Sequence, residues 1–179
     1  MGRLPTLTRD VLAPEGQAVW DRIAAVRDGV RGPYEVLIRV PALADRVRAL
    51  EDYFRFDAAL SDAERELIIL ATGRELGARF AWGVHEPRAR QVGTRPEAIK
   101  AVRDDSPLDG LTPRERLLVE MVRALLRERA LSDNLYARAL DDLGERQLVE
   151  VVALIGHYSL IGLLLNGFAV PPREGSPGF

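Results

Sequence analysis

The residue whose type and position first indicate chemistry is His85, one of two histidines in the 179-residue sequence. It lies in the stretch ARFAWGVHEPRARQVG, residues 78–93. At helical spacing, one face of this stretch carries Ala78, Trp82, His85, Ala89 and Val92, whereas Arg79, Glu86 and Arg90 fall elsewhere. An imidazole on such a face is either a core residue with one satisfied hydrogen bond or an acid and base that exchanges protons near neutral pH. The pattern alone leaves both interpretations open.

The amino-acid composition excludes several other kinds of site. The sequence contains no cysteine, which removes disulfides, thiolate nucleophiles, redox dithiols and cysteine-ligated zinc. Lys100 is the only lysine and lies in the polar segment PEAIKAVRDD, so Schiff-base catalysis is not expected. His85, Glu86 and the distant His157 show no established ligand spacing, and we expect no metal.

Charge and hydropathy favour a soluble protein. The formal net charge of −2 gives no indication of binding to nucleic acid or to a membrane surface. Residues 151–170, VVALIGHYSLIGLLLNGFAV, carry no formal charge and are long enough to span a bilayer. Because this stretch also contains His157, Tyr158, Ser159 and Asn166, it is more typical of a central helix buried on all sides. The first residues, MGRLPTLTRDVLAPEG, lack an apolar signal region, so the expected location is the cytoplasm.

Helical signals dominate the chain and predict an all-α fold, a single-domain helical bundle. Ser61 opens SDAERELIILATGREL with Glu64 three residues later, the pattern of a capping box. Gly77 is placed to end that helix, and Gly93 is placed to end the next one, which carries His85. Apolar spacing predicts two further helices, with Val19, Ile23 and Val26 in residues 14–28, and with Leu43, Val47, Leu50 and Phe54 after Pro41.

Pro87 leaves the course of the His85 helix open. A proline inside a helix lacks an N–H, and its ring crowds the carbonyl four residues earlier, which here belongs to Gly83. Either the helix continues with a kink and leaves that carbonyl free beside His85, or one helix ends and another begins at Pro87.

Two similar segments indicate an internal duplication. LSDAEREL at residues 60–67 and LTPRERLL at 111–118 both resemble a capped helix start followed by an apolar run, and each precedes a helix that carries a histidine. The expected organisation is an N-terminal arm and helix over residues 1–31, a helical domain over 32–171, and a tail over 172–179 whose composition is typical of disorder.

Several ordered motifs give most of the chain a family resemblance. Residues 32–93, from GPYEVLIRV to RARQVG, and residues 147–171, QLVEVVALIGHYSLIGLLLNGFAVP, resemble the carboxymuconolactone decarboxylase and alkyl hydroperoxidase D-like superfamily. The spacing of Trp82 and His85 is similar to that of its longer branch. The resemblance implies an all-helical fold with a core hairpin of helices, assembled as a homo-oligomer: a dimer, trimer or hexamer.

The resemblance also places the family's functional residues on this sequence. Redox members use a glutamate, a Cys-x-x-Cys pair and a histidine four residues after the second cysteine. Counted back from His85, the cysteine positions are Ala81 and Ala78, and the glutamate falls on Glu66. Reduction of peroxide through a dithiol needs thiolates, which alanine does not supply. The resemblance therefore implies an acid–base pair of Glu66 and His85 without the peroxidase sulfurs.

What remains is similar to the decarboxylase members, which implies a cofactor-free lyase acting on a small carboxylated or enolisable molecule, a carboxylic acid or a lactone. Loss of CO₂ from a β-keto or vinylogous acid leaves an enolate-like charge. A buried Glu66 carboxylate would orient His85 and favour its cationic form, which could stabilise that charge and then protonate carbon. Isomerisation, hydration and ring cleavage use the same kind of pair and stay open.

Aromatic residues near the pair are candidates for substrate binding. Trp82, Phe80 and Tyr158 are expected to wall an apolar pocket around a planar substrate, and His157 is a further candidate. Each has a structural alternative, since such residues on an apolar face often serve only packing. The alternative function is a non-catalytic oligomeric member that has lost the Cys-x-x-Cys centre and either binds a ligand or has a structural role.

Overall fold

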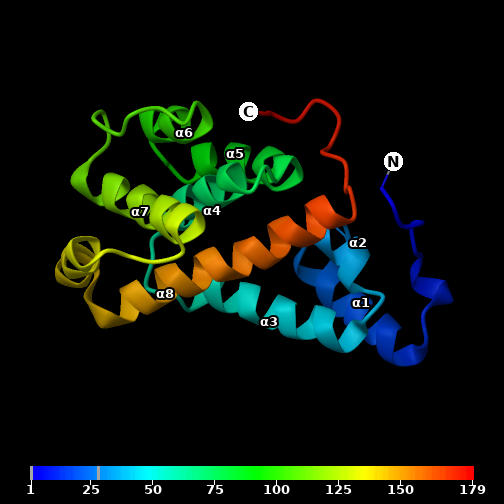
Figure 1. The fold of residues 1–179 in the computed structure, drawn as a ribbon. Helices are drawn as coiled ribbons and strands as arrows, with labels where there is room; N and C mark the ends of the chain where they lie inside the picture. The colour runs from blue at the N-terminus through cyan, green and yellow to red at the C-terminus, as the bar shows by residue number, and fades with distance from the viewer. Residues whose placement is uncertain (1, 28) are drawn as a thin grey trace.

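The computed structural model describes residues 2–27 and 29–179; Met1 and Asp28, which belong to the predicted arm and to the predicted 14–28 helix, lie outside the described residues. The helices are η1 (Arg9–Val11), α1 (Pro14–Val26), α2 (Pro33–Leu37), α3 (Pro41–Phe56), α4 (Asp62–Glu75), α5 (Arg79–Gln91), α6 (Pro96–Arg103), α7 (Pro113–Arg123), η2 (Ala124–Glu128) and α8 (Asp133–Gly167). No strand occurs in the described ranges, so the predicted all-α class is confirmed. Figure 1 shows α8 running between α3 on one side and the group of α4, α5 and α6 on the other.

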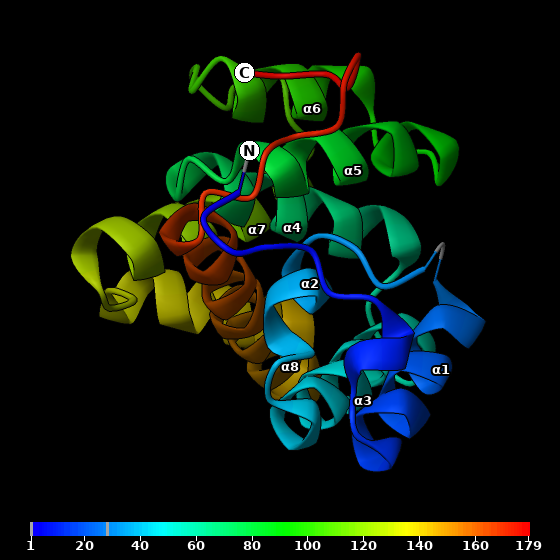
Figure 2. The same ribbon diagram turned by 90° about the vertical axis from the view of Figure 1, so that its right-hand side faces the viewer.

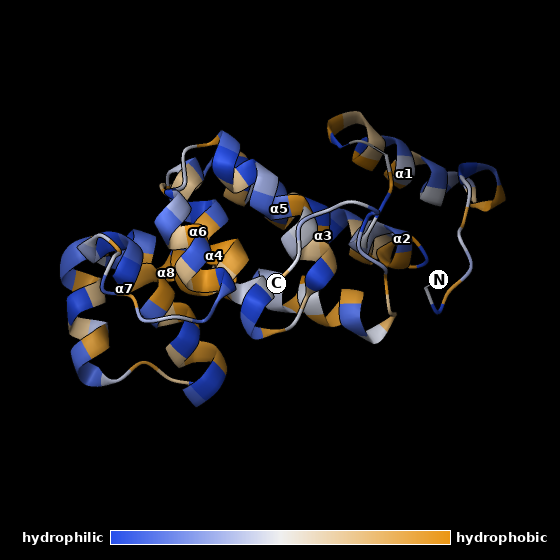
Figure 3. Ribbon diagram, turned by 90° about the horizontal axis from the view of Figure 1, so that it is seen from above, coloured by the Kyte–Doolittle hydropathy of each residue, from blue (hydrophilic) through white to orange (hydrophobic). Residues whose placement is uncertain are grey.

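α4 is the central helix of the fold because its middle is buried on all sides. Every residue from Glu66 to Gly73 is buried, and a helix without an exposed polar face is stable only when other elements surround it. α5, α6, α7 and α8 all pack against α4. In Figure 3, α4 and the neighbouring part of α8 are mostly orange, whereas α5 and α7 carry more hydrophilic residues. Glu66 is the one charged residue in this run, so its carboxylate needs a partner inside the protein.

Capping boxes start α4 and α7. The Ser61 side chain accepts a hydrogen bond from the Glu64 backbone N–H, and the Glu64 carboxylate accepts one from the Ser61 N–H at 2.9 Å. Thr112 and Glu115 form the same reciprocal pair at the start of α7. The predicted capping box of α4 is confirmed, and the internal duplication stays a prediction.

Three of the predicted core positions are exposed. The exposed fractions of Val26, Leu43 and Leu50 are 45%, 44% and 45%. Val26 is the last residue of α1. The buried arc of α3 is centred on Ala44, Val47 and Phe54, so Leu43 and Leu50 flank this arc instead of facing the core.

α5 continues through Pro87 as one helix, which settles the alternative that the sequence left open. Glu86, expected away from the buried face, is buried, and its carboxylate pairs with the Arg90 guanidinium at 2.6 Å. Val92, expected on the buried face, is the C-cap residue and is partly exposed because the helix has ended.

α8 is long and apolar, yet much of it lies inside the fold. Gly144 interrupts it with φ 67° and ψ 169°, so the element consists of two helical pieces. It is the one helix of the described residues that is long and apolar enough to cross a membrane, and 56% of its most apolar window, with mean hydropathy 2.0, is buried in the protein. This burial is typical of the core helix of a soluble protein.

The segment 171–179 packs against the helices although its composition is typical of disorder. Figure 2 shows it running from the end of α8 across α5 towards α6. The Phe179 ring lies edge-on to the Trp82 ring, with 5.2 Å between the centroids. The predicted tail is therefore a packed part of the fold.

The Ser61 cap gives a direct test of how α4 is held. We expect Ser61→Ala to lower the free energy of unfolding by about 1 kcal/mol, because the Glu64 N–H loses its acceptor. Urea unfolding followed by circular dichroism measures this change. Ser159→Ala is the control, since the Ser159 hydroxyl only bonds the Ile155 carbonyl within its own helix; an equal loss in both variants would contradict the capping role.

Candidate functional site

The hairpin of α4 and α5 brings Glu66 and His85 together. Gly77 has a φ of 65°, and the Ala78 N–H donates to the Gly73 carbonyl at 2.8 Å, which ends α4 and turns the chain directly into α5. Across this hairpin, Nδ1 of His85 lies 2.7 Å from Oε2 of Glu66. The exposed fractions of Glu66 and His85 are 5% and 8%, so the contact is shielded from bulk water.

This contact determines the roles of the two imidazole nitrogens. When the Glu66 carboxylate is ionised it only accepts hydrogen bonds, and Nδ1 of His85 is then the donor and carries a proton. Nε2 has no hydrogen-bond partner in the described part of the chain. Nε2 is therefore the atom that can accept a proton from a ligand, or donate one to it when the ring is cationic.

His85 lies in the wall of a cavity of about 140 Å³. The wall also contains Tyr34, Glu51, Phe80, Arg88 and Tyr158. A neighbouring hollow of about 210 Å³ is lined by both Glu66 and His85, and it shares Glu51, Arg55, Arg88 and Tyr158 with the first. Glu66 and His85 thus lie where a small molecule in either space could reach the imidazole.

Tyr158 is a second polar group next to His85. The two rings are perpendicular, with 5.2 Å between their centroids, and Tyr158 lines both hollows. Burial, followed by the carboxylates of Glu51 and Glu66, raises the pKa of the Tyr158 phenol well above its ordinary value of 10.0. The hydroxyl therefore stays protonated and can act as a neutral hydrogen-bond donor.

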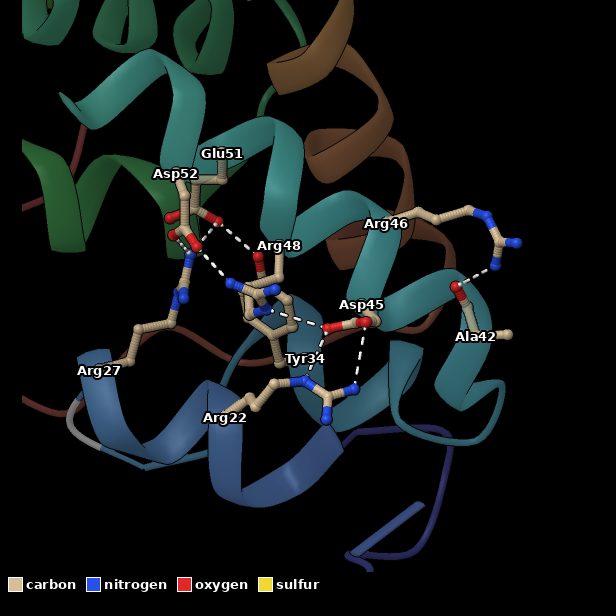
Figure 4. A network of polar contacts seen from close by, with 9 residues as sticks. All are labelled: Arg22, Arg27, Tyr34, Ala42, Asp45, Arg46, Arg48, Glu51 and Asp52. Atoms are coloured by element: carbon tan, nitrogen blue, oxygen red, sulfur yellow. Dashed lines mark hydrogen bonds and ion pairs between the residues drawn. The ribbon is translucent and has the colours of Figure 1, made fainter. Parts of the chain in front are cut away.

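Glu51 of α3 is a functional candidate that sequence reasoning missed. Figure 4 shows Arg27, the residue that follows α1, and Tyr34 of α2 reaching it. The Tyr34 hydroxyl donates to Oε2 of Glu51 at 2.6 Å, and Nη2 of Arg27 lies 3.1 Å from the same oxygen. Burial raises the pKa of Glu51, but Arg27 and Tyr34 outweigh burial, so the net pKa is lowered and the carboxylate stays ionised. Its position on the buried face of α3, between Val47 and Phe54, was the signal that could have found it.

Arginines give the cavity a cationic wall. Arg27, Arg31, Arg55, Arg88 and Arg173 line it. Arg27 is held by Glu51 and Asp52. Among the residues that the structure describes, Arg55, Arg88 and Arg173 form no ion pair with a carboxylate. A cavity with such walls attracts anions. Arg88 follows His85 by three residues, a helical spacing that could have marked it in the sequence.

The predicted substrate-binding residues divide into two groups. Phe80 and Tyr158 line the cavity, as expected of a pocket wall. Trp82 and His157 lie outside this wall: Trp82 is fully buried and contacts Phe179, and the His157 ring contacts the rings of Phe54 and Tyr158. Their role in substrate binding stays a prediction.

The positions that the family resemblance gives to cysteines carry small apolar side chains that are buried. Ala78 is fully buried at the start of α5, and Ala81 is part of the cavity wall. Within residues 2–27 and 29–179, no group of three histidine, aspartate or glutamate side chains gathers in a way that could hold a metal ion.

Comparison with known proteins gives a family match within the helical core. Residues 41–124, which include α3, the α4–α5 hairpin, α6 and α7, match the model of the Carboxymuconolactone decarboxylase family. Glu66 and His85 both lie inside the matched residues. No curated protein matches the sequence.

Solved structures share the fold over most or nearly all of the chain. One is an alkylhydroperoxidase AhpD core, an uncharacterized peroxidase-related protein from Ralstonia eutropha JMP134, with a TM-score of 0.81 and 15% identity, where 97% of this chain covers 93% of that chain. A peroxidase-related protein from Silicibacter sp. TM1040 has a TM-score of 0.77 and 15% identity over 98% of this chain and 93% of that chain. A protein of unknown function from Agrobacterium tumefaciens has a TM-score of 0.68 and 21% identity over 77% of this chain and 95% of that chain. At these identities the likeness establishes the fold.

His157 makes the stability of the fold depend on pH. Burial lowers the pKa of His157 from its ordinary value of 6.5, and Glu51 only partly offsets this effect. The unfolded chain therefore binds a proton at higher pH than the folded protein, and stability is lost as the pH falls below about 6.5, by at most about 1.4 kcal/mol per pH unit.

We expect the free energy of unfolding of the wild type to fall relative to that of His157→Phe between pH 7.5 and pH 5. Denaturant titration at each pH measures the free energy of unfolding of both proteins. Because the other titrating groups are common to both, their contributions cancel in the difference. A difference that does not change with pH would contradict the neutral, buried state of His157.

Proposed function

We propose that the chain is a member of the carboxymuconolactone decarboxylase and alkyl hydroperoxidase D-like superfamily, and that it is a cofactor-free lyase that removes CO₂ from a small carboxylated, enolisable molecule. The observation that carries the proposal is the buried contact of 2.7 Å between Glu66 Oε2 and His85 Nδ1 at a cavity wall. The structural neighbours are named peroxidase-related, but dithiol chemistry is not proposed here because the sequence has no cysteine.

The proposed reaction breaks the bond between the carboxylate carbon and the α-carbon of a β-keto or vinylogous acid. The electron pair of that bond moves towards the keto oxygen, which gives an enolate, and CO₂ leaves. The cationic His85 then transfers its Nε2 proton to carbon and becomes neutral, while its Nδ1 proton stays in the hydrogen bond to Glu66. A proton from water restores the cation. The net reaction converts the substrate carboxylate and one proton into product and CO₂.

The polar groups around His85 suit the charge that develops in this reaction. The neutral Tyr158 hydroxyl can donate to the enolate oxygen, which carries more charge in the transition state than in the ground state. An arginine bound to the departing carboxylate would stabilise the ground state and slow the loss of CO₂. We therefore assign the departing carboxylate to the apolar part of the wall, formed by Ala81, Val84 and Ile161.

The alternative is a non-catalytic member of the superfamily that binds a small ligand. The observation in its favour is the burial of Glu66 and His85, since a buried carboxylate and imidazole can also serve only to hold two helices together. The two functions differ in whether a bound molecule is consumed.

Substitution of the acid–base pair tests the lyase directly. We expect His85→Gln and Glu66→Gln each to lower turnover of a reactive substrate by about 10²- to 10⁴-fold, because proton transfer to carbon loses its donor or the group that orients it. The assay follows CO₂ release from a panel of β-keto acids and carboxylated lactones.

Arg79→Gln is the matched control, since Arg79 is an exposed residue of α5 outside both hollows. If His85→Gln and Glu66→Gln turn the substrate over as fast as Arg79→Gln does, the acid–base role is contradicted. If a panel compound binds without being consumed, the non-catalytic alternative replaces the lyase.

The proposal includes a cytoplasmic homo-oligomer without a nucleic-acid or membrane partner. An exposed apolar stripe on the outer face of α8 supports self-association. It consists of Val149, Val152, Leu160 and Leu163, with exposed fractions of 67%, 39%, 41% and 64%. An uncharged stripe of this kind is complementary to a second copy of itself across a two-fold axis, whereas it offers nothing to a charged partner.

We expect Val149→Glu combined with Leu163→Glu to shift the protein to a smaller sedimenting species, because burying two carboxylates in the contact is unfavourable. Sedimentation velocity at several concentrations measures the change. A wild-type protein that sediments as a monomer at all concentrations would contradict the assignment of this face.

A further inference from the structure

The segment 171–179 is fixed to the α4–α5 hairpin at its far end. Phe179 stacks edge-on against Trp82 of α5, and the Arg74 guanidinium of α4 lies 4.8 Å from the centroid of the same Phe179 ring. Trp82 is itself fully buried. These two contacts hold the segment across the helix that carries His85.

The middle of the segment lies so close to α5 that only glycine fits beneath it. A Cβ atom added at Gly83 would lie 2.6 Å from Oγ and 2.9 Å from Cβ of Ser176. Ser176 also closes a turn, since its hydroxyl donates to the Arg173 carbonyl at 2.6 Å and its N–H donates to the same oxygen at 3.1 Å. The approach to Gly83 and this turn together set the position of Arg173.

Arg173 lines the same cavity as His85, Tyr158 and Arg88. Arg27, also in the wall, already carries hydrogen bonds and ion pairs to Glu51 and Asp52. Arg88 and Arg173 have no carboxylate partner within the described residues, so their guanidinium groups are available to a ligand. A guanidinium binds a carboxylate through a matched pair of N–H donors.

We propose that Arg173 and Arg88 form a carboxylate-binding subsite at the cavity, and that the segment 171–179 thereby selects substrates with an anionic group that the reaction leaves in place. The selection of substrates rests on the proposed function, whereas the subsite itself requires only that a carboxylate binds. The departing carboxylate lies against the apolar wall, so the arginines hold the part of the molecule that is retained. Orientation by this charge would place the reacting carbon towards His85.

Binding of benzoate and of its neutral isostere benzamide tests the subsite without any turnover. A single ring matches a cavity of about 140 Å³, and the two probes differ in charge and not in size. We expect calorimetric titration of the full chain to show that benzoate binds at least tenfold more tightly than benzamide. Arg173→Gln and Arg88→Gln should each weaken benzoate binding about 10- to 100-fold and leave benzamide unchanged. Glu174→Gln is the control next to Arg173 and should bind benzoate no more weakly than the wild type.

Gly83→Ala tests whether the packing of the segment 171–179 against α5 positions Arg173 at the cavity. Its methyl group displaces Ser176, so benzoate binding should weaken to the level of Arg173→Gln although no charge is lost. Gly110→Ala, where a methyl group meets nothing within 4 Å, should bind as the wild type does. Circular dichroism confirms that each variant is folded.

The outcomes separate this inference from the proposed function. Loss of benzoate binding in Arg173→Gln together with an inert substrate panel retains the subsite and removes the lyase. Turnover that depends on His85 while Arg173→Gln binds and reacts as the wild type retains the lyase and overturns the subsite. Failure of the wild type to prefer benzoate over benzamide also overturns the subsite, and unchanged binding by Gly83→Ala overturns the role of the segment.

Discussion

The burial of α4 is the constraint on which the rest of the structure depends. A run from Glu66 to Gly73 without an exposed position can exist in water only inside a shell of other helices, and α5, α6, α7 and α8 form that shell. A carboxylate in this run needs a hydrogen-bond donor from the protein, because bulk water does not reach it. His85 on the adjoining helix meets it, so the packing of the core and the geometry of the site have one cause.

A second buried carboxylate faces the same space with different partners. Glu51 forms an ion pair with Arg27 and accepts a hydrogen bond from the Tyr34 hydroxyl, whereas Glu66 is paired with an imidazole. The first arrangement keeps a fixed charge, because arginine does not release its proton under ordinary conditions. In the second, the imidazole contacts the carboxylate through Nδ1, and its Nε2 has no hydrogen-bond partner among the residues that the structure describes. Burial and then both carboxylates raise the pKa of the Tyr158 phenol, so the two arrangements act on the same neutral hydroxyl.

Local sequence signals predicted the helices and the turn that pairs them, because a cap or a glycine at a helix end acts within a few residues. The capping box at Ser61 and the end of α4 at Gly77 are of this kind. The pairing of Glu66 with His85 followed from the family resemblance. Arg27 and Arg173 were beyond such reasoning, since they reach the cavity from segments far apart in the chain. For Glu51, helical spacing indicated the buried face of α3 but not the cavity opposite it.

The same limit applies to Trp82 and His157, which lie outside the cavity wall. Helical spacing places both on buried faces, but it does not tell whether a cavity or another side chain lies opposite. For Trp82 the answer is Phe179, from a segment whose composition is typical of disorder. For His157 it is the ring of Phe54 on α3. Burial was predictable from the pattern, whereas the identity of the neighbour depended on tertiary structure.

Pro87 gives the imidazole a backbone unlike that of its partner. Because a proline has no N–H, the Gly83 carbonyl lacks its usual donor one turn later. The turn that contains His85 therefore has one backbone hydrogen bond fewer than a regular helix. Segments with fewer backbone bonds open locally at lower free energy, and amide hydrogens report such openings by their exchange with solvent. Glu66 therefore lies on a central helix without a proline, whereas His85 lies on a helix that lacks one backbone hydrogen bond, so local opening costs less free energy around His85 than around Glu66.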